Sequence, residues 1–150
     1  MDQRSAPKAR ARKRVLIVDD EPSVLSMLRG FFASFHHGHV YQITTAESAT
    51  DAFSLLRQEQ FDLILLDIVM PAARGLWIKE RNLGLGLLAR FRDLGVTAPV
   101  LMMTGVWKDV GKEGEARNAG VAGVLYKPIA LRELDETVER ILRSDAASAR

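Results

Sequence analysis

The stretch FDLILLDIVMP, residues 61–71, decides the fold of this 150-residue chain. Apolar residues fill positions 61–66 except for Asp62, and so short an apolar run is typical of a strand buried on both faces of a parallel sheet. The run ends on Asp67, and Pro71 then prevents the strand from continuing. A carboxylate at the end of a buried strand needs a cation or a hydrogen-bond donor beside it. The sequence therefore predicts that other polar groups reach the same edge of the sheet.

Further apolar stretches alternate with helical patterns along the chain. The other predicted strands lie at 15–18, around 40–43, and at 99–104 and 121–126. Helical spacing of apolar residues predicts helices at 22–34, 49–56, 87–94 and 131–142, with a shorter polar helix at 109–118. Thr45 is the expected N-cap of the second helix. This alternation of five strands with five helices predicts an α/β protein with a parallel sheet.

Polar residues of interest fall where the predicted strands end. Asp19 and Asp20 follow the first strand, Asp67 closes the third, Thr104 closes the fourth and Lys127 follows the fifth. The carboxyl ends of parallel strands share one edge, where ligands bind. Oxygen ligands favour a hard cation such as Mg²⁺, and a carboxylate nucleophile beside a lysine and a hydroxyl suits phosphoryl transfer. We therefore expect phosphorylation of Asp67, which stands alone on the central strand.

These motifs, in this order, resemble the response regulator receiver domains of two-component signalling. The resemblance implies a doubly wound, flavodoxin-like sheet of order 2-1-3-4-5 with helices on both faces. It implies that Asp67 accepts a phosphoryl group from a sensor histidine kinase or a phosphotransfer protein, and that Thr104 and Lys127 contact that group. The matching positions, within residues 13–143, are Asp19-Asp20, Asp67 followed by Met70-Pro71, Thr104 after PVLMM, and Lys127-Pro128.

The same resemblance implies a magnesium site and a mode of signalling. Asp20, Asp67 and the backbone carbonyl of Val69 would bind Mg²⁺, with Asp19 acting through water. The chain is expected to catalyse only its own phosphorylation and dephosphorylation, and to signal by binding a downstream protein. The absence of cysteine and of any bilayer-length apolar stretch fits a cytoplasmic protein without membrane insertion.

Four features depart from the family pattern. Val124 stands where the family usually has an aromatic residue, and Tyr126 directly precedes the lysine. About nine residues are inserted near 76–84, beside the phosphorylation site. The positions two after the phosphorylated aspartate and two after the threonine are the apolar Val69 and Val106. The chain also ends soon after the last helix, so no output domain is expected.

The net charge of +2 conceals two regions of opposite sign. Residues 1–14 hold six Lys or Arg against one Asp, so the remainder is mildly acidic. We expect residues 1–12 to form a basic disordered arm, residues 13–144 the receiver domain, and residues 145–150 a frayed tail. An alternative function is that of an adaptor that uses the basic arm to bind nucleic acid or an acidic partner. Nucleic acid is disfavoured, because no recognition helix or aromatic platform accompanies the arm.

Three other functions are less well supported: a freestanding phosphohydrolase, a nucleotide-binding protein and a metal site at the histidines. A freestanding phosphohydrolase would need a second acid to protonate a leaving group, and the Asp19-Asp20-Glu21 run lacks the alternating spacing expected for one. A nucleotide-binding protein would need a glycine-rich loop after the first strand. His36, His37 and His39 are interpreted as a solvated turn, because they lie in a predicted loop without a carboxylate or cysteine partner.

Overall fold

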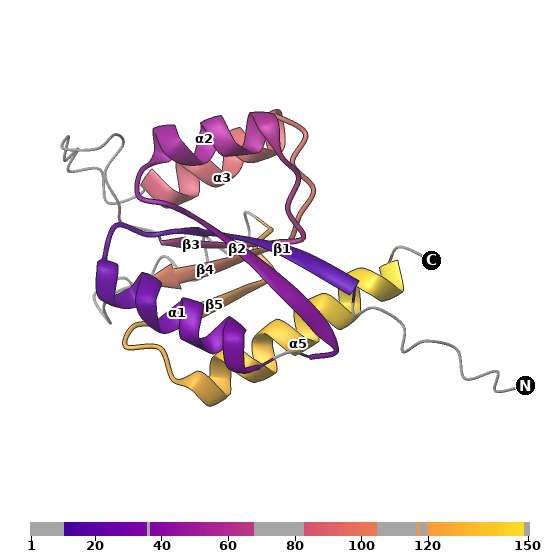
Figure 1. Ribbon diagram of the computed structural model, residues 1–150. Helices are drawn as coiled ribbons and strands as arrows, with labels where there is room; N and C mark the ends of the chain where they lie inside the picture. Colours follow the sequence, from indigo (N-terminus) through magenta and orange to yellow (C-terminus); the bar gives the residue numbers. More distant parts are fainter. Residues whose placement is uncertain (1–10, 36, 68–82, 105–116, 118–119, 149–150) are drawn as a thin grey trace, which may run out of the picture.

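The computed structural model describes residues 11–35, 37–67, 83–104, 117 and 120–148. Five parallel strands form one sheet of order β2-β1-β3-β4-β5, which confirms the predicted fold class and strand order (Figure 1). The strands are β1 Ala11–Val18, β2 His39–Ala46, β3 Leu63–Asp67, β4 Val100–Thr104 and β5 Gly123–Tyr126. The helices of the described residues are α1 Pro22–Ser34, α2 Ala49–Gln58, α3 Leu83–Asp93 and α5 Leu131–Ser148.

Strand β3 is the centre of the sheet, and all five of its residues are buried. Side chains alternate between the two faces of a strand. Leu63 and Leu65 pack in the core beneath α1 and α5, whereas Ile64 and Leu66 pack against α2 and α3 on the other face (Figure 1). The apolar run at 61–66 is therefore explained by helices on both sides. The strand itself begins two residues later than the apolar run.

Strand β1 begins at Ala11, four residues before the apolar run at 15–18. Residues 11–14 pair in parallel register with residues 39–42 of β2. A strand requires backbone partners, not apolar side chains, and β2 extends far enough to supply them. The predicted disordered arm is thus wrong for residues 11 and 12. Residues 1–10 lie outside the described residues.

The start of α2 and the end of α5 differ from the predicted helix ends. Ser48, not Thr45, is the N-cap of α2, and its hydroxyl accepts a hydrogen bond from the Asp51 N–H at 3.1 Å. Thr45 still belongs to β2, whose pairing with β1 continues to Ala46. Helix α5 continues to Ser148, through most of the predicted frayed tail. Ala146 and Ala147 in this segment have the highest intrinsic helix propensity.

Several sequence predictions fall partly or wholly outside the described residues. These are the helix at 109–118, the residues Val69 and Val106, and most of the insert near 76–84. The last two residues of that insert, Leu83 and Gly84, form the start of α3. No helix in the described part of the chain combines the length and apolarity needed to cross a bilayer.

Candidate functional site

The predicted site residues meet at the carboxyl edge of the sheet. Asp19 and Asp20 directly follow β1, and Asp67 is the last residue of β3. Thr104 is the last residue of β4, and Lys127 directly follows β5. The parallel register of β1 with β3, of β3 with β4, and of β4 with β5 brings these strand ends to one edge.

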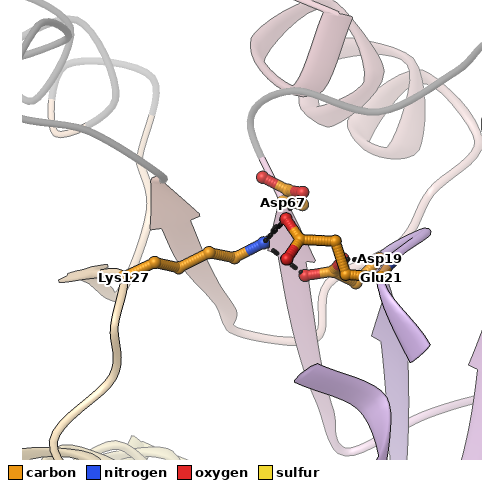
Figure 2. A network of polar contacts seen from close by, with 4 residues as sticks. All are labelled: Asp19, Glu21, Asp67 and Lys127. Carbon is orange, nitrogen blue, oxygen red and sulfur yellow. Dashed lines mark hydrogen bonds and ion pairs between the residues drawn. The ribbon is translucent and has the colours of Figure 1, made fainter. Parts of the chain in front are cut away.

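Lys127 is the centre of the polar network drawn in Figure 2. Its Nζ lies 2.7 Å from Asp19 Oδ2, 3.1 Å from Asp67 Oδ2 and 3.2 Å from Glu21 Oε1. The Lys127 backbone N–H donates to the Thr104 carbonyl oxygen at 2.8 Å, which positions the lysine at the end of β5. Asp19 and Asp67 are buried, so neither carboxylate can rely on water to offset its charge.

The pKa of Lys127 shows how strongly this network favours the charged ammonium. Burial on its own lowers the pKa of a lysine. The hydrogen bond from Lys127 to Asp19 and the negative charge of Asp67 outweigh burial and raise the Lys127 pKa above its usual value. Lys127 is therefore a permanent cation at neutral pH, available to a phosphoryl oxygen as a point charge.

Three carboxylates form the acidic part of the site. Oxygen atoms of Asp19, Asp20 and Asp67 lie within 4.8 Å of one another. Burial and the neighbouring charges of Asp19 and Glu21 raise the pKa of Asp20, against the lowering effects of a backbone hydrogen bond and of Lys127. Carboxylates this close repel one another, and a hard divalent cation relieves that repulsion. The donor set consequently fits Mg²⁺, with Val69 outside the described residues.

Thr104 presents a buried hydroxyl at the same edge. Its side chain is only 2% exposed. Within the described part of the chain, Thr104 Oγ1 has no hydrogen-bond partner. A buried hydroxyl without a partner is destabilising, so it is more typical of a group that serves a ligand than of one that serves the fold.

Glu21 is a site residue that the sequence reasoning missed. An acidic residue directly before Pro22 is also favoured by the dipole at the start of a helix, so the sequence alone gives Glu21 no distinct role. The Glu21 side chain instead reaches Lys127 across the carboxyl edge (Figure 2). A cavity of 440 Å³ opens beside this contact, lined by Glu21, Val24 and Met27 on one side and by residues 127–129 on the other.

His37 corrects the interpretation of the histidines as a solvated turn. Its side chain is 8% exposed, its Nδ1 lies 2.8 Å from the Tyr41 hydroxyl, and its Nε2 contacts the Asp135 carboxylate. Asp135 is 98 residues away on α5, so no local pattern could reveal this partner. Burial and the charge of Asp135 raise the pKa of Tyr41. His39 lies in β2, and His36 is outside the described residues.

This chain is similar to a known protein family and to several curated proteins. Residues 15–139 match the response regulator receiver domain family. The chain is 33% identical over 130 residues to Protein PilH of Pseudomonas aeruginosa, which covers 86% of this chain and 97% of PilH. It is 30% identical over 133 residues to the transcriptional regulatory protein ZraR of Salmonella typhimurium. That match covers 89% of this chain but 27% of ZraR, so the chain spans about a quarter of that relative's length.

Solved structures of other proteins share this fold. A CheY-like response regulator receiver domain protein from Methanospirillum hungatei superposes with a TM-score of 0.72 at 25% identity, covering 92% of this chain and 99% of that one. The receiver domain of the Francisella response regulator 1452 superposes with a TM-score of 0.71 at 22% identity, covering 89% and 98%. With the family match over residues 15–139, these observations show that the chain belongs to the response regulator receiver domain family.

Proposed function

We propose that this chain is a single-domain response regulator that accepts a phosphoryl group on Asp67 in a Mg²⁺-dependent reaction. The observation that carries the proposal is the buried Asp67 carboxylate, 3.1 Å from Lys127 and within 4.8 Å of the Asp19 and Asp20 carboxylates. Membership of the receiver family supports phosphoryl acceptance, and with it a histidine kinase or phosphotransfer protein as the donor.

The arrangement suits an in-line displacement at phosphorus. An oxygen of Asp67 attacks the phosphorus, and the bond from phosphorus to the donor atom breaks, so that the donor leaves with the electron pair. From a phosphohistidine the leaving group is the imidazole; from acetyl phosphate it is acetate. Lys127 donates a hydrogen bond to one phosphoryl oxygen and the Thr104 hydroxyl donates to another.

Asp20 and Asp67, together with the carbonyl of Val69, would hold the metal ion, and Asp19 would act through water. Bound Mg²⁺ supplies positive charge against the phosphoryl oxygens. Apart from this charge, the chain's own residues provide the nucleophile and two donors. The product is a mixed anhydride on Asp67, and the protein signals when a downstream protein binds the phosphorylated form.

Intact-mass spectrometry after incubation with acetyl phosphate and MgCl₂ tests the proposal. The wild-type chain is expected to gain the mass of one phosphoryl group, and a chelator should prevent the gain. Asp67→Asn should gain none, because an amide is a poor nucleophile of nearly the same shape. Asp93→Asn, at an exposed position of α3, is the matched control and should behave as wild type. An acid-labile phosphate on Asp67→Asn would refute the assignment.

Receiver domains are phosphoacceptors and not conventional enzymes, in agreement with the family match. The identity of the downstream protein and the cytoplasmic location stay predictions. Binding of nucleic acid or an acidic partner by the arm also stays a prediction, because residues 1–10 lie outside the described residues. No second function is therefore proposed.

A further inference from the structure

Glu21 contacts Lys127 at the phosphorylation site but has no part in the proposed phosphoryl transfer. It is the N-cap residue of α1, a position where a side chain usually accepts a hydrogen bond from a helix N–H. The Glu21 side chain makes no such capping bond. Its Oε1 lies instead 3.2 Å from Nζ of Lys127. Its backbone N–H donates to Asp19 Oδ1 at 2.9 Å, which fixes the base of the side chain beside the lysine.

The ammonium group of a lysine has three donors, and three carboxylates surround the one on Lys127. An oxygen of the incoming phosphoryl group requires one of these donors while Asp67 is still a carboxylate, so one existing contact has to give way. The Asp19 and Asp67 side chains are both buried, and loss of the cation at this stage would leave either one as an unpaired charge in the interior. The Glu21 side chain is 54% exposed, so water solvates its carboxylate once it is released. Glu21 is therefore the contact that is released at the lowest cost.

We propose that Glu21 is a positioning residue: it holds the Lys127 ammonium before phosphorylation and cedes its donor to the incoming phosphoryl group. The inference rests on the proposed function. The cavity of 440 Å³ beside Glu21 gives the released side chain room to turn away from the lysine. Because the Glu21 contact has to break as Lys127 engages the phosphoryl oxygen, Glu21 slows phosphoryl acceptance.

Two substitutions of Glu21 separate direct contact from mere negative charge. Glu21→Gln keeps the shape of the side chain and removes its charge. Glu21→Asp keeps the charge but shortens the side chain by one methylene, which withdraws the carboxylate from Nζ. Glu136→Gln is the matched control, because Glu136 pairs with Arg132 at 3.4 Å on the exposed face of α5.

Rates of phosphorylation by acetyl phosphate with Mg²⁺, followed by intact mass, provide the main readout. Both Glu21 variants are expected to react about twofold to fivefold faster than wild type, the range that an exposed ion pair allows. Glu136→Gln should react at the wild-type rate. NMR of the Lys127 ammonium in the absence of phosphodonor should show greater mobility in both Glu21 variants, with the thermal midpoint unchanged.

Each other outcome has a definite meaning. Wild-type rates in both Glu21 variants would overturn the inference and leave the proposed function intact. A fast Glu21→Gln with a wild-type Glu21→Asp would also overturn it, because the negative charge and not the contact would then set the rate. A wild-type chain that takes up no phosphate would instead refute the proposed function, and the positioning role with it.

Discussion

The amino end and the carboxyl end of the sheet both hold carboxylates beside a cation. They differ in the number of carboxylates per cation and in how deeply the carboxylates are buried. At the amino end, Arg14 pairs with Glu59, and its guanidinium carbon lies 5.2 Å from the centroid of the Phe61 ring. The Arg14 backbone N–H donates to Asp62 Oδ2 at 2.8 Å. At the carboxyl end, three carboxylates share the single ammonium of Lys127.

This difference separates a network that serves the fold from one that serves a ligand. The side chains of Arg14 and Glu59 are 31% and 34% exposed, so their ion pair is screened by water and stabilises only modestly. At the carboxyl end, Asp19 and Asp67 are buried, and Asp20 adds further negative charge. Packing carboxylates together does not favour folding. Buried charge in excess of its partners is therefore the better indicator of function.

The largest effect is expected when the carboxyl end loses its cation. Lys127→Met should lower the free energy of unfolding by about 3–5 kcal/mol at neutral pH, because the buried Asp19 and Asp67 carboxylates then lack a partner. Added Mg²⁺ should restore part of this loss. Urea denaturation with and without Mg²⁺ measures both effects. Arg132→Met, which removes an exposed ion pair on α5, should change stability by less than about 0.5 kcal/mol. Equal losses of unfolding free energy in Lys127→Met and Arg132→Met would show that the Lys127 ion pairs are no more important to the fold than an exposed ion pair.

At the amino end, Asp62→Ala should be milder and indifferent to metal. It removes the acceptor of the Arg14 backbone N–H, a loss of about 1–2 kcal/mol. Since Asp62 lies at the opposite end of β3 from Asp67, Mg²⁺ should not restore this stability, and the rate of phosphorylation should stay at the wild-type value. Rescue of Asp62→Ala by Mg²⁺ would mean that the two ends of the sheet are coupled.

Two buried hydroxyls sharpen the comparison further. Ser48 caps α2 and is 0% exposed, so Ser48→Ala should cost about 1 kcal/mol. Thr104 is 2% exposed and has no hydrogen-bond partner within the described residues, so Thr104→Val, which replaces this hydroxyl with a methyl group of similar shape, should leave the free energy of unfolding unchanged or raise it. Only Thr104→Val should slow phosphorylation. A loss of stability in Thr104→Val as large as that in Ser48→Ala would show that the hydroxyl serves the fold.

The smallest expected effect is the pH dependence that Asp20 contributes. Its pKa is raised above the ordinary 3.8, chiefly by burial, so the folded state binds this proton more tightly than the unfolded state. The stability that Asp20 contributes is complete below the ordinary value and is lost as the pH rises through the raised pKa. Asp20→Asn should remove this loss, and urea unfolding across a pH series would measure it. A gap between wild type and Asp20→Asn that stays constant over this window would contradict the assignment.

The sequence was most informative where side chains follow a period and least informative where distant groups meet. The apolar run before Asp67 predicted a central strand, because burial on both faces leaves a continuous signature. The sequence also predicted which polar residues share an edge of the sheet, since the carboxyl ends of parallel strands lie at the same edge. It did not reveal the start of β1 at Ala11, because backbone pairing leaves no side-chain pattern. Nor could it reveal that His37 contacts Asp135 on α5, since that contact depends on tertiary packing.

The length of β1 has a consequence for the range of the chain's electric field. Asp19 lies seven positions after Arg12, and an extended strand rises about 3.3 Å per residue, so roughly 23 Å lie between them. The Debye length at physiological ionic strength is about 8 Å. Over nearly three such lengths, the field of an exposed charge is largely screened. The exposed charge of Arg12 at the start of β1 therefore leaves the electrostatic potential at the carboxyl end of the strand almost unaltered.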